Sequence, residues 1–233
     1  MKFNQRLIEG RLIKRYKRFL ADVLLPDGNT ITCHCPNSGS MKTCTGENWP
    51  VLLSKSDNPK RKYAYTWEMV HNGRCWIGIN THLANIIAFE AINDGIISEL
   101  QGYDIIEREK KYGTNSRIDI LLHKGDAKCY VEVKNVTLVE EDGYYRFPDS
   151  VTTRGLKHLK ELRKIVKVGG RAVMLYVIQR SDGSIFKAAD HIDPDYANEL
   201  KSAYEDGVEI MPYLADVNPN GIKLIRKIDF SLK

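Results

Sequence analysis

The hydrophobic periodicity of this chain changes near residue 80, and this change constrains the fold more than any other feature. Before it, short segments such as residues 30–35 alternate polar and apolar side chains and follow turn residues such as 26–29. That pattern is typical of β-strands joined in hairpins. After it, apolar residues recur at helical spacing in longer segments, with strands between them. The sequence therefore predicts an all-β part, residues 1–80, and a mixed α/β part, residues 81–233.

The N-terminal part contains short predicted strands with no convincing helix between them. These strands cover residues 20–25, 30–35, 51–53, 63–70 and 75–79. Short strands in this number favour a small closed barrel, and an OB-like barrel is the expected architecture.

The C-terminal part is expected to alternate helices and strands around one central sheet. Gly95 and Gly169 are helix stop signals, and Asp193 followed by Pro194 is a helix start signal. The expected helices are residues 81–94, 151–168 and 193–205, and the expected strands are 103–109, 117–122, 128–134, 171–179 and 208–217.

Charge is divided unevenly between the two parts. Residues 1–80 carry 13 Lys and Arg against 6 Asp and Glu, whereas residues 81–233 carry 22 against 24. A basic part beside a slightly acidic part predicts that one binds a polyanion while the other uses its carboxylates differently. The alternative is a solvated surface with random charge placement.

Several classes of protein are not expected. No run approaches the roughly 18–20 apolar residues of a membrane helix, and the N-terminal segment lacks the features of a signal peptide. The five cysteines are odd in number and unevenly spaced, which favours a reducing compartment, so we expect a cytoplasmic protein. Cys33, His34, Cys35 and Cys44 lack the paired spacing of structural zinc sites, so thiols in the core or in loops are favoured over zinc.

Two predicted strands carry the clearest chemical signal. Asp119 lies between Ile118 and Ile120, where a carboxylate is costly unless its charge is compensated. Glu132 and Lys134 share one face of the next strand, since side chains alternate along a strand. If the strands are neighbours, Asp119 and Glu132 can converge on a hard cation, Mg²⁺ or Mn²⁺, with Lys134 beside it to position water or a phosphate. The alternative for Glu132 and Lys134 is a solvated salt bridge.

Three residues on predicted helices are expected near this site. Glu90 continues the apolar stripe of the first helix, so we expect it to face inward as a further acid of the site. Arg154 and His158 lie one turn apart at the start of the long helix, where they suit a phosphate. The alternatives are a surface acid for Glu90 and a structural role for His158.

Basic residues with aromatic neighbours predict a nucleic-acid-binding surface on the N-terminal part. Cations beside aromatic rings suit a groove that follows a phosphate backbone while bases stack. No recognition helix is apparent, so little sequence specificity is expected. DNA is the expected partner, RNA is the alternative, and residues 34–39 are expected to form a loop of defined shape. The residues expected to bind are Arg15, Lys17, Arg18, Lys60, Arg61 and Lys62.

Five segments together resemble the SfsA family, the sugar fermentation stimulation proteins. They are residues 19–22, 34–39, 116–119, 132–134 and 148–159, and the resemblance covers essentially the whole chain. Asp119 followed by Glu132 and Lys134 also resembles the PD-(D/E)XK nuclease signature, although Ile118 stands where the motif has proline.

This resemblance implies a two-domain α/β protein, with an OB-like barrel followed by a PD-(D/E)XK nuclease-like domain. It implies that Asp119, Glu132 and Glu90 are metal ligands and that Lys134 is the catalytic lysine. It also implies DNA binding and a regulatory link to sugar (maltose) metabolism.

Two functions from different classes follow. The first is Mg²⁺-dependent phosphodiester cleavage with sequence-tolerant nucleic-acid binding. The second is a non-catalytic DNA-binding regulator of sugar (maltose) metabolism genes that keeps the nuclease fold as a scaffold. The presence of Glu90, Asp119, Glu132 and Lys134 together favours the first, and nothing in the sequence supports a sugar-binding enzyme.

Overall fold

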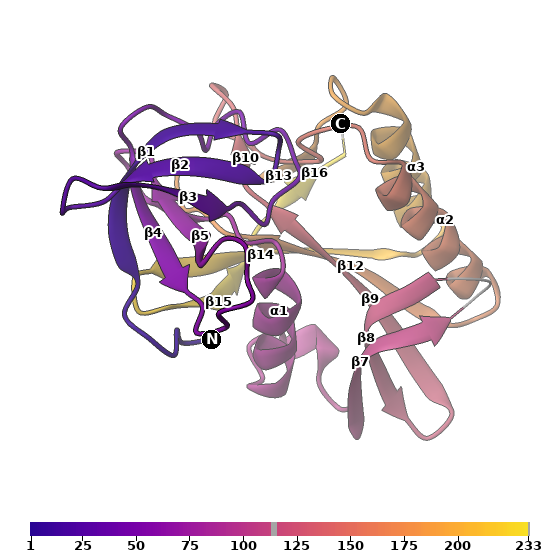
Figure 1. Cartoon of the computed structure of the whole chain (residues 1–233). Coiled ribbons are helices and arrows are strands. Elements are labelled where there is room, and N and C mark those ends of the chain that lie inside the picture. Colours follow the sequence, from indigo (N-terminus) through magenta and orange to yellow (C-terminus); the bar gives the residue numbers. More distant parts are fainter. Residues whose placement is uncertain (113–115, 233) are drawn as a thin grey trace.

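The N-terminal part of the chain forms a β-barrel (Figure 1). In the computed structural model, which describes residues 1–112 and 116–232, its strands pair in the order β3-β2-β1-β4-β5-β6. A further pairing of β3 with β5, between His34 and Thr66, closes the barrel. The strands are β1 (Ile8–Tyr16), β2 (Leu20–Leu24), β3 (Thr30–His34), β4 (Pro50–Lys55), β5 (Tyr65–His71) and β6 (Trp76–Gly78).

Alternation of side chains explains how these strands enclose a core. In β2, Ala21 and Val23 point inward, whereas Leu24 is exposed. β1 is not among the predicted strands, because its many basic residues obscure the same alternation, in which Gly10 and Leu12 are buried. The barrel core also takes up the thiols of Cys33, Cys35 and Cys44, so these cysteines are core residues.

The C-terminal part is built on a six-stranded mixed sheet with the order β15-β14-β12-β9-β8-β7. β12 runs parallel to both β9 and β14, and the outer pairs are antiparallel. β12 is buried along nearly its whole length, as expected for a parallel strand covered on both faces. The strands are β7 (Ile105–Tyr112), β8 (Ser116–Lys124), β9 (Ala127–Val136), β12 (Arg171–Ile178), β14 (Glu209–Asn218) and β15 (Gly221–Lys227).

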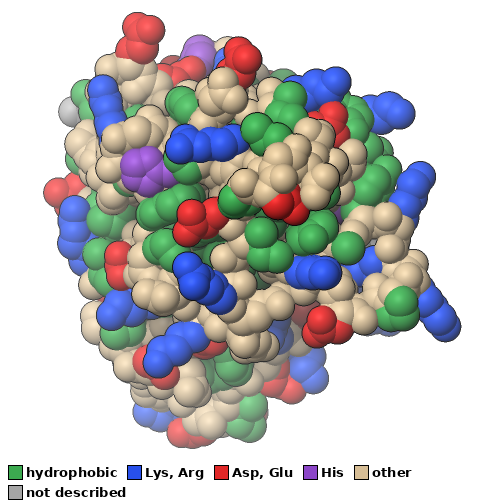
Figure 2. All heavy atoms as spheres, turned by 60° about the vertical axis from the view of Figure 1, so that its left-hand side comes forward, with side chains coloured by type: hydrophobic (Ala, Val, Ile, Leu, Met, Phe, Trp, Pro, Cys, Tyr) green, Lys and Arg blue, Asp and Glu red, His purple; other side chains and the backbone are tan. Residues whose placement is uncertain are grey.

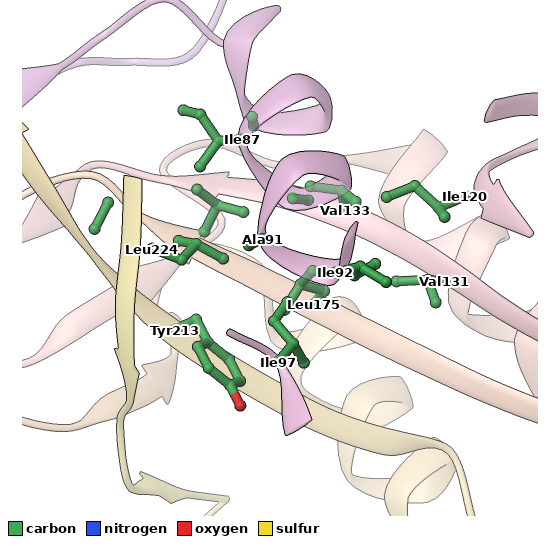
Figure 3. Packing of buried hydrophobic residues seen from close by; sticks show 14 of the residues in the cluster. Ile87, Ala91, Ile92, Ile97, Ile120, Val131, Val133, Leu175, Tyr213 and Leu224 are labelled. Atoms are coloured by element: carbon green, nitrogen blue, oxygen red, sulfur yellow. The ribbon is translucent and has the colours of Figure 1, made fainter. Parts of the chain in front are cut away.

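Helices cover both faces of this sheet. α1 (Leu83–Asn93) lies on the face nearer the barrel, and α2 (Thr153–Lys167) and α3 (Pro194–Glu205) lie on the other (Figure 1). Figure 3 shows Ile87 and Ala91 of α1 against Val133 and Leu224 of the sheet. The buried face of α1 packs in one core with Val131 and Val133 of β9, which places α1 beside the strands that carry the site.

The N-termini of α2 and α3 are tied together by their capping residues. Thr152 caps α2 by accepting a hydrogen bond from the backbone N of Gly155 at 3.0 Å. Asp193 caps α3 through the backbone N of Tyr196 at 3.0 Å, and its other oxygen accepts from the backbone N of Thr152 at 2.8 Å. The start of α2 is therefore held in a defined place.

A small four-stranded sheet that the sequence does not predict completes the structure. It consists of β10 (Leu138–Val139), β11 (Tyr145–Phe147), β13 (Phe186–Ala188) and β16 (Phe230–Ser231), in that order, and a short 3-10 helix, η1 (Ser98–Leu100), follows α1. The four strands of this small sheet have two or three residues each, which is too short to give a periodic signal.

The barrel and the α/β part share buried polar contacts. The backbone N of Gly78 in the barrel donates to the carbonyl of Gln179 at 2.9 Å. Arg180, only 3% exposed, donates to the carbonyl of Thr137 at 2.6 Å and to the hydroxyl of Thr43 at 2.9 Å. The bonds of Gly78 to Gln179 and of Arg180 to Thr43 link the barrel to the α/β part. None of the helices in the described ranges is long and apolar enough to cross a membrane.

Candidate metal centre

Asp119 and Glu132 come together because β8 and β9 are neighbours. The register pairs Ile120 with Val131. Beyond this pair the Asp119 carboxylate accepts a hydrogen bond from the backbone N of Val133 at 2.8 Å, so the side chain replaces a backbone acceptor. The other Asp119 oxygen accepts from the amide of Asn85 on α1 at 2.8 Å. Both Asp119 oxygens are thereby oriented.

Glu132 is the most buried acid of the site, with 1% of its surface exposed. Its Oε1 accepts a hydrogen bond from Lys134 Nζ at 2.6 Å and is also in contact with Nδ1 of His158. Its Oε2 is buried and has no hydrogen-bond partner within the described residues. A buried carboxylate oxygen without a partner is costly, and the arrangement fits an oxygen that ligates a cation.

The two carboxylates respond differently to their shared environment. Burial, followed by the negative charge of Glu132, raises the pKa of Asp119 to about 6. Burial also opposes ionisation of Glu132, but the charge of Lys134 and the hydrogen bond from His158 outweigh it and keep the pKa of Glu132 below its usual value. A divalent cation beside both acids would stabilise the ionised form of each.

His158 links Glu132 to the surface of α2. A carboxylate oxygen can only accept, so Nδ1 of His158 carries the proton in this contact. Nε2 then accepts a hydrogen bond from Nε of Arg154 at 3.4 Å. Lys134 Nζ, 3.3 Å from Nδ1, donates to the same Glu132 oxygen. The predicted pair on α2 therefore contacts the acidic cluster, with buried His158 inside and exposed Arg154 at the entrance.

These residues line a pocket of about 340 Å³ to which both parts of the chain contribute. From the α/β part come Asp119, Glu132 and Lys134, with Arg154 at the start of α2. From the barrel comes the segment that follows β3, residues 37–39. The pocket therefore lies between the two parts of the chain.

Arg15 holds this barrel loop in shape. Its guanidinium donates to the carbonyls of Asn37 at 2.8 Å, Gly39 at 2.9 Å and Ser40 at 3.2 Å. The sequence predicts Arg15 as a nucleic-acid contact, whereas the structure uses its donors inside the protein. Spacing along β1 cannot reveal this, because the loop that it binds lies more than twenty residues away.

Two segments that are distant in the sequence meet at Gly39. A Cβ atom on this residue would lie 2.3 Å from both carboxylate oxygens of Asp149, so a larger residue would have to displace that carboxylate. The same carboxylate accepts a hydrogen bond from the backbone N of Met41 at 3.1 Å. Residues 37–39 of the predicted loop thus form one wall of the pocket, whereas His34 belongs to β3.

Glu90 is not brought to this cluster, which corrects the expectation that it faces inward. Its side chain is 43% exposed, and its carboxylate lies 2.6 Å from the amino group of Met1. The buried face of α1 is formed by Ala84, Ile87, Ala88, Ala91 and Ile92, so Glu90 lies at its edge. Asn85 of α1 instead contacts Asp119, which sequence reasoning missed. Its signal was an amide inside a helix, where asparagine is unfavourable without a specific partner.

The remaining basic residues lie on two different connections of the barrel. Lys17 and Arg18 occupy the exposed β1–β2 turn, both with positive φ. Lys60, Arg61 and Lys62 are exposed on the β4–β5 connection. Figure 2, which brings the left-hand side of Figure 1 forward, shows Lys and Arg scattered over that face with Asp and Glu among them. No single basic stripe is visible on that face.

A closed barrel joined to a mixed α/β domain, with two acids and a lysine on adjacent strands, defines a class: proteins with an OB domain and a restriction endonuclease-like domain. The family models agree with this description. Residues 13–79 match the SfsA N-terminal OB domain, and residues 82–221 match the sugar fermentation stimulation protein RE domain. The chain belongs to the SfsA family, and the predicted fold class is confirmed.

Relatives extend over nearly the whole chain. A sugar fermentation stimulation protein homolog of Geotalea uraniireducens (strain Rf4) is 54% identical over 222 residues, which is 95% of this chain and 96% of that protein. A homolog of Shewanella loihica (strain ATCC BAA-1088 / PV-4) is 54% identical over 227 residues, 96% of this chain and 97% of that protein. The solved structure of Pyrococcus furiosus SfsA in complex with Ca²⁺ is similar with a TM-score of 0.89 and 26% identity, covering 99% of this chain and 98% of that one.

Proposed function

We propose that this protein cleaves phosphodiester bonds in nucleic acid with the help of a divalent cation held by Asp119 and Glu132. The observation that carries the proposal is the unpartnered, buried Oε2 of Glu132 beside a second acid and a lysine. The related Pyrococcus furiosus SfsA was solved in complex with Ca²⁺, which supports a divalent cation in this family. Mg²⁺ or Mn²⁺ is the proposed cofactor, since Mg²⁺ commonly uses one or two carboxylates and completes its shell with water and phosphate.

The donor set fits such a cation. All the ligands offered are hard oxygens, and within the described part of the chain no three His, Cys, Asp or Glu side chains form a closed cage. Two protein ligands leave positions for water and substrate. A cation held here would polarise a phosphoryl oxygen and lower the pKa of bound water.

The side chains around the acids have distinct tasks in this proposal. Asn85 and the backbone N of Val133 hold the Asp119 oxygens in place. Lys134 Nζ, next to Glu132, is placed to orient the attacking water or to balance charge on the phosphate. Arg154, exposed at the entrance, is proposed to bind a phosphate oxygen. Because it also contacts His158, a substrate bound to Arg154 would be placed relative to Glu132.

The test is incubation of the purified protein with labelled single- and double-stranded DNA and RNA in Mg²⁺, Mn²⁺ or EDTA. We expect cleavage only with metal, and a loss of about 100-fold or more in Glu132→Ala, since metal polarisation contributes several kcal/mol. Glu90→Gln, which changes an acid outside the pocket, is the matched control and should cleave normally.

Binding without cleavage in every condition would overturn the enzymatic proposal. The α/β domain would then act as a scaffold, and the function would be that of a non-catalytic DNA-binding regulator of sugar (maltose) metabolism genes. Glu132→Ala should still bind nucleic acid, and loss of binding with the fold intact would show that Glu132 takes part in binding as well as in cleavage.

A further inference from the structure

Three basic side chains lie on segments that the barrel and the start of α1 bring close together: His34, Arg61 and His82. His34 ends β3 and pairs with Thr66 on β5. Arg61, on the β4–β5 connection, donates to the hydroxyl of the same Thr66 at 3.0 Å. His82 is the N-cap residue, immediately before α1. They come from three separate segments, so only the closed barrel and its contact with α1 bring them together.

One hydrogen bond joins the segments that carry His34 and His82 next to the pocket. The hydroxyl of Thr81 donates to the carbonyl of Pro36 at 2.7 Å, which joins the start of α1 to the end of β3. Thr81 also lines the metal pocket. One turn further along α1, Asn85 contacts Asp119. The start of α1 therefore contacts the segment after β3 through Thr81 and the carboxylate of Asp119 through Asn85.

A buried acid in the barrel supports the same cluster. Glu68 is 5% exposed and accepts hydrogen bonds from Ser54 at 2.6 Å and from the amide of Asn80 at 2.7 Å. The oxygen of that Asn80 side chain accepts from the backbone N of His82 at 3.1 Å. Burial raises the pKa of Glu68, and the positive charges of Arg61 and His82 oppose this. Through Asn80, Glu68 thus holds the backbone at His82, just before α1.

The electrostatics of His34 agree with this placement. Burial, followed by the charges of Arg61 and His82, lowers its pKa. His34 is half-buried, whereas Arg61 and His82 are exposed, so the latter two present their donors to solvent. Next to Arg61 in the chain, Lys62 lies 5.6 Å from the ring centre of Tyr63. A phosphate-binding group beside an aromatic ring is the arrangement used for single strands, whose bases are free to stack.

We propose that His34, Arg61 and His82 form a phosphate-binding site for a single strand of nucleic acid, which passes from the metal pocket over the start of α1 onto the β3–β5 side of the barrel. This inference rests on the proposed function and names its substrate class. It assigns the strand to the β4–β5 connection and away from β1, where Arg15 is occupied by the loop at residues 37–40 and Lys14 lies 3.8 Å from Asp22.

The experiment measures binding separately from cleavage. Fluorescence anisotropy with a labelled oligothymidylate of about 20 nucleotides, and with a duplex of the same length, is recorded in EDTA over a range of salt concentrations. Arg61→Ala combined with His82→Ala should weaken single-strand binding about tenfold or more and reduce the slope of log Kd against log salt by roughly 0.7 for each phosphate that the variant no longer neutralises. Both residues are exposed, and an unchanged Tm confirms that the fold is kept.

Arg74→Ala is the matched control, because it removes an exposed arginine from the β5–β6 connection of the same barrel. It should leave affinity and salt slope unchanged. The proposal is overturned if Arg61→Ala with His82→Ala has no effect, if Lys17→Ala with Arg18→Ala has a larger one, or if the duplex binds more tightly with the same dependence. An unmutated protein that binds no oligonucleotide would overturn the proposed function as well, whereas binding that is insensitive to Arg61 and His82 overturns this inference alone.

Discussion

The barrel and the α/β domain contribute to the same pocket in different ways. The α/β domain supplies side chains, Asp119, Glu132 and Lys134, from adjacent strands. The barrel supplies a loop whose shape depends on Arg15 binding its carbonyls. Strands place side chains by local alternation, whereas a loop needs partners elsewhere in the chain to hold it. This difference predicts that changes on the two sides of the pocket will have different consequences.

The largest effect is expected on the α/β side, at Asp119. Asp119→Asn removes a charged ligand while keeping the shape of the side chain, so metal-dependent cleavage should fall by about 100-fold or more. Isothermal titration with Mn²⁺ measures metal affinity directly. Cleavage and metal affinity at the level of the unmutated protein would show that the carboxylates are not the metal site.

A smaller effect is expected on the barrel side, at Arg15. Arg15→Ala removes three hydrogen bonds to loop carbonyls. The free energy of unfolding should fall by about 1–3 kcal/mol, because the substitution leaves buried acceptors unpaired. The KM for nucleic acid should rise, since the loop wall is loosened, while the salt slope of binding stays the same. A reduced salt slope would instead show that Arg15 contacts phosphate directly, as the sequence predicts.

A substitution at Asn85 tests whether α1 supports metal binding by orienting the Asp119 carboxylate. Asn85→Ala removes the 2.8 Å hydrogen bond to the Asp119 carboxylate without touching Glu132. Metal affinity should weaken by about 10-fold, in the range found when a ligand no longer has its supporting hydrogen bond. Glu90→Ala, on the same helix but bound to the Met1 amino group, is the control and should leave metal affinity unchanged. Equal effects in both variants would show a general disturbance of α1.

The smallest effect concerns the pH dependence of stability without metal. The pKa of Asp119 is raised from 3.8 to about 6 in the folded protein. Its contribution to stability is therefore complete below pH about 4 and is lost as pH rises through about 6. In EDTA, Asp119→Asn should remove this loss and unfold at a higher temperature than the unmutated protein at pH 8, with little difference at pH 4. Calorimetry at both pH values measures it, and the same difference at both would exclude the raised pKa as its cause.

Local pattern was enough for much of the fold. The alternation in β8 and β9 put Glu132 and Lys134 on one face, and the structure keeps them together at 2.6 Å. The helical spacing and capping signals predicted α1, α2 and α3 to within a few residues. These features depend on neighbours a few positions apart, and periodicity and capping describe such neighbours directly.

Tertiary structure decided the rest of the site. Which side of α1 faces the carboxylates depends on how the helix sits on the sheet, so Asn85 reaches Asp119 and Glu90 pairs with Met1 instead. The hydrogen bonds of Arg15 and the close approach of Asp149 to Gly39 depend on contacts with residues far along the chain. The sequence by itself determined the barrel, the α/β domain and the two acid-bearing strands, because hydrophobic periodicity and strand alternation are local. Only packing between distant segments could place the barrel loop opposite Asp119 and Glu132 and enclose a pocket between them.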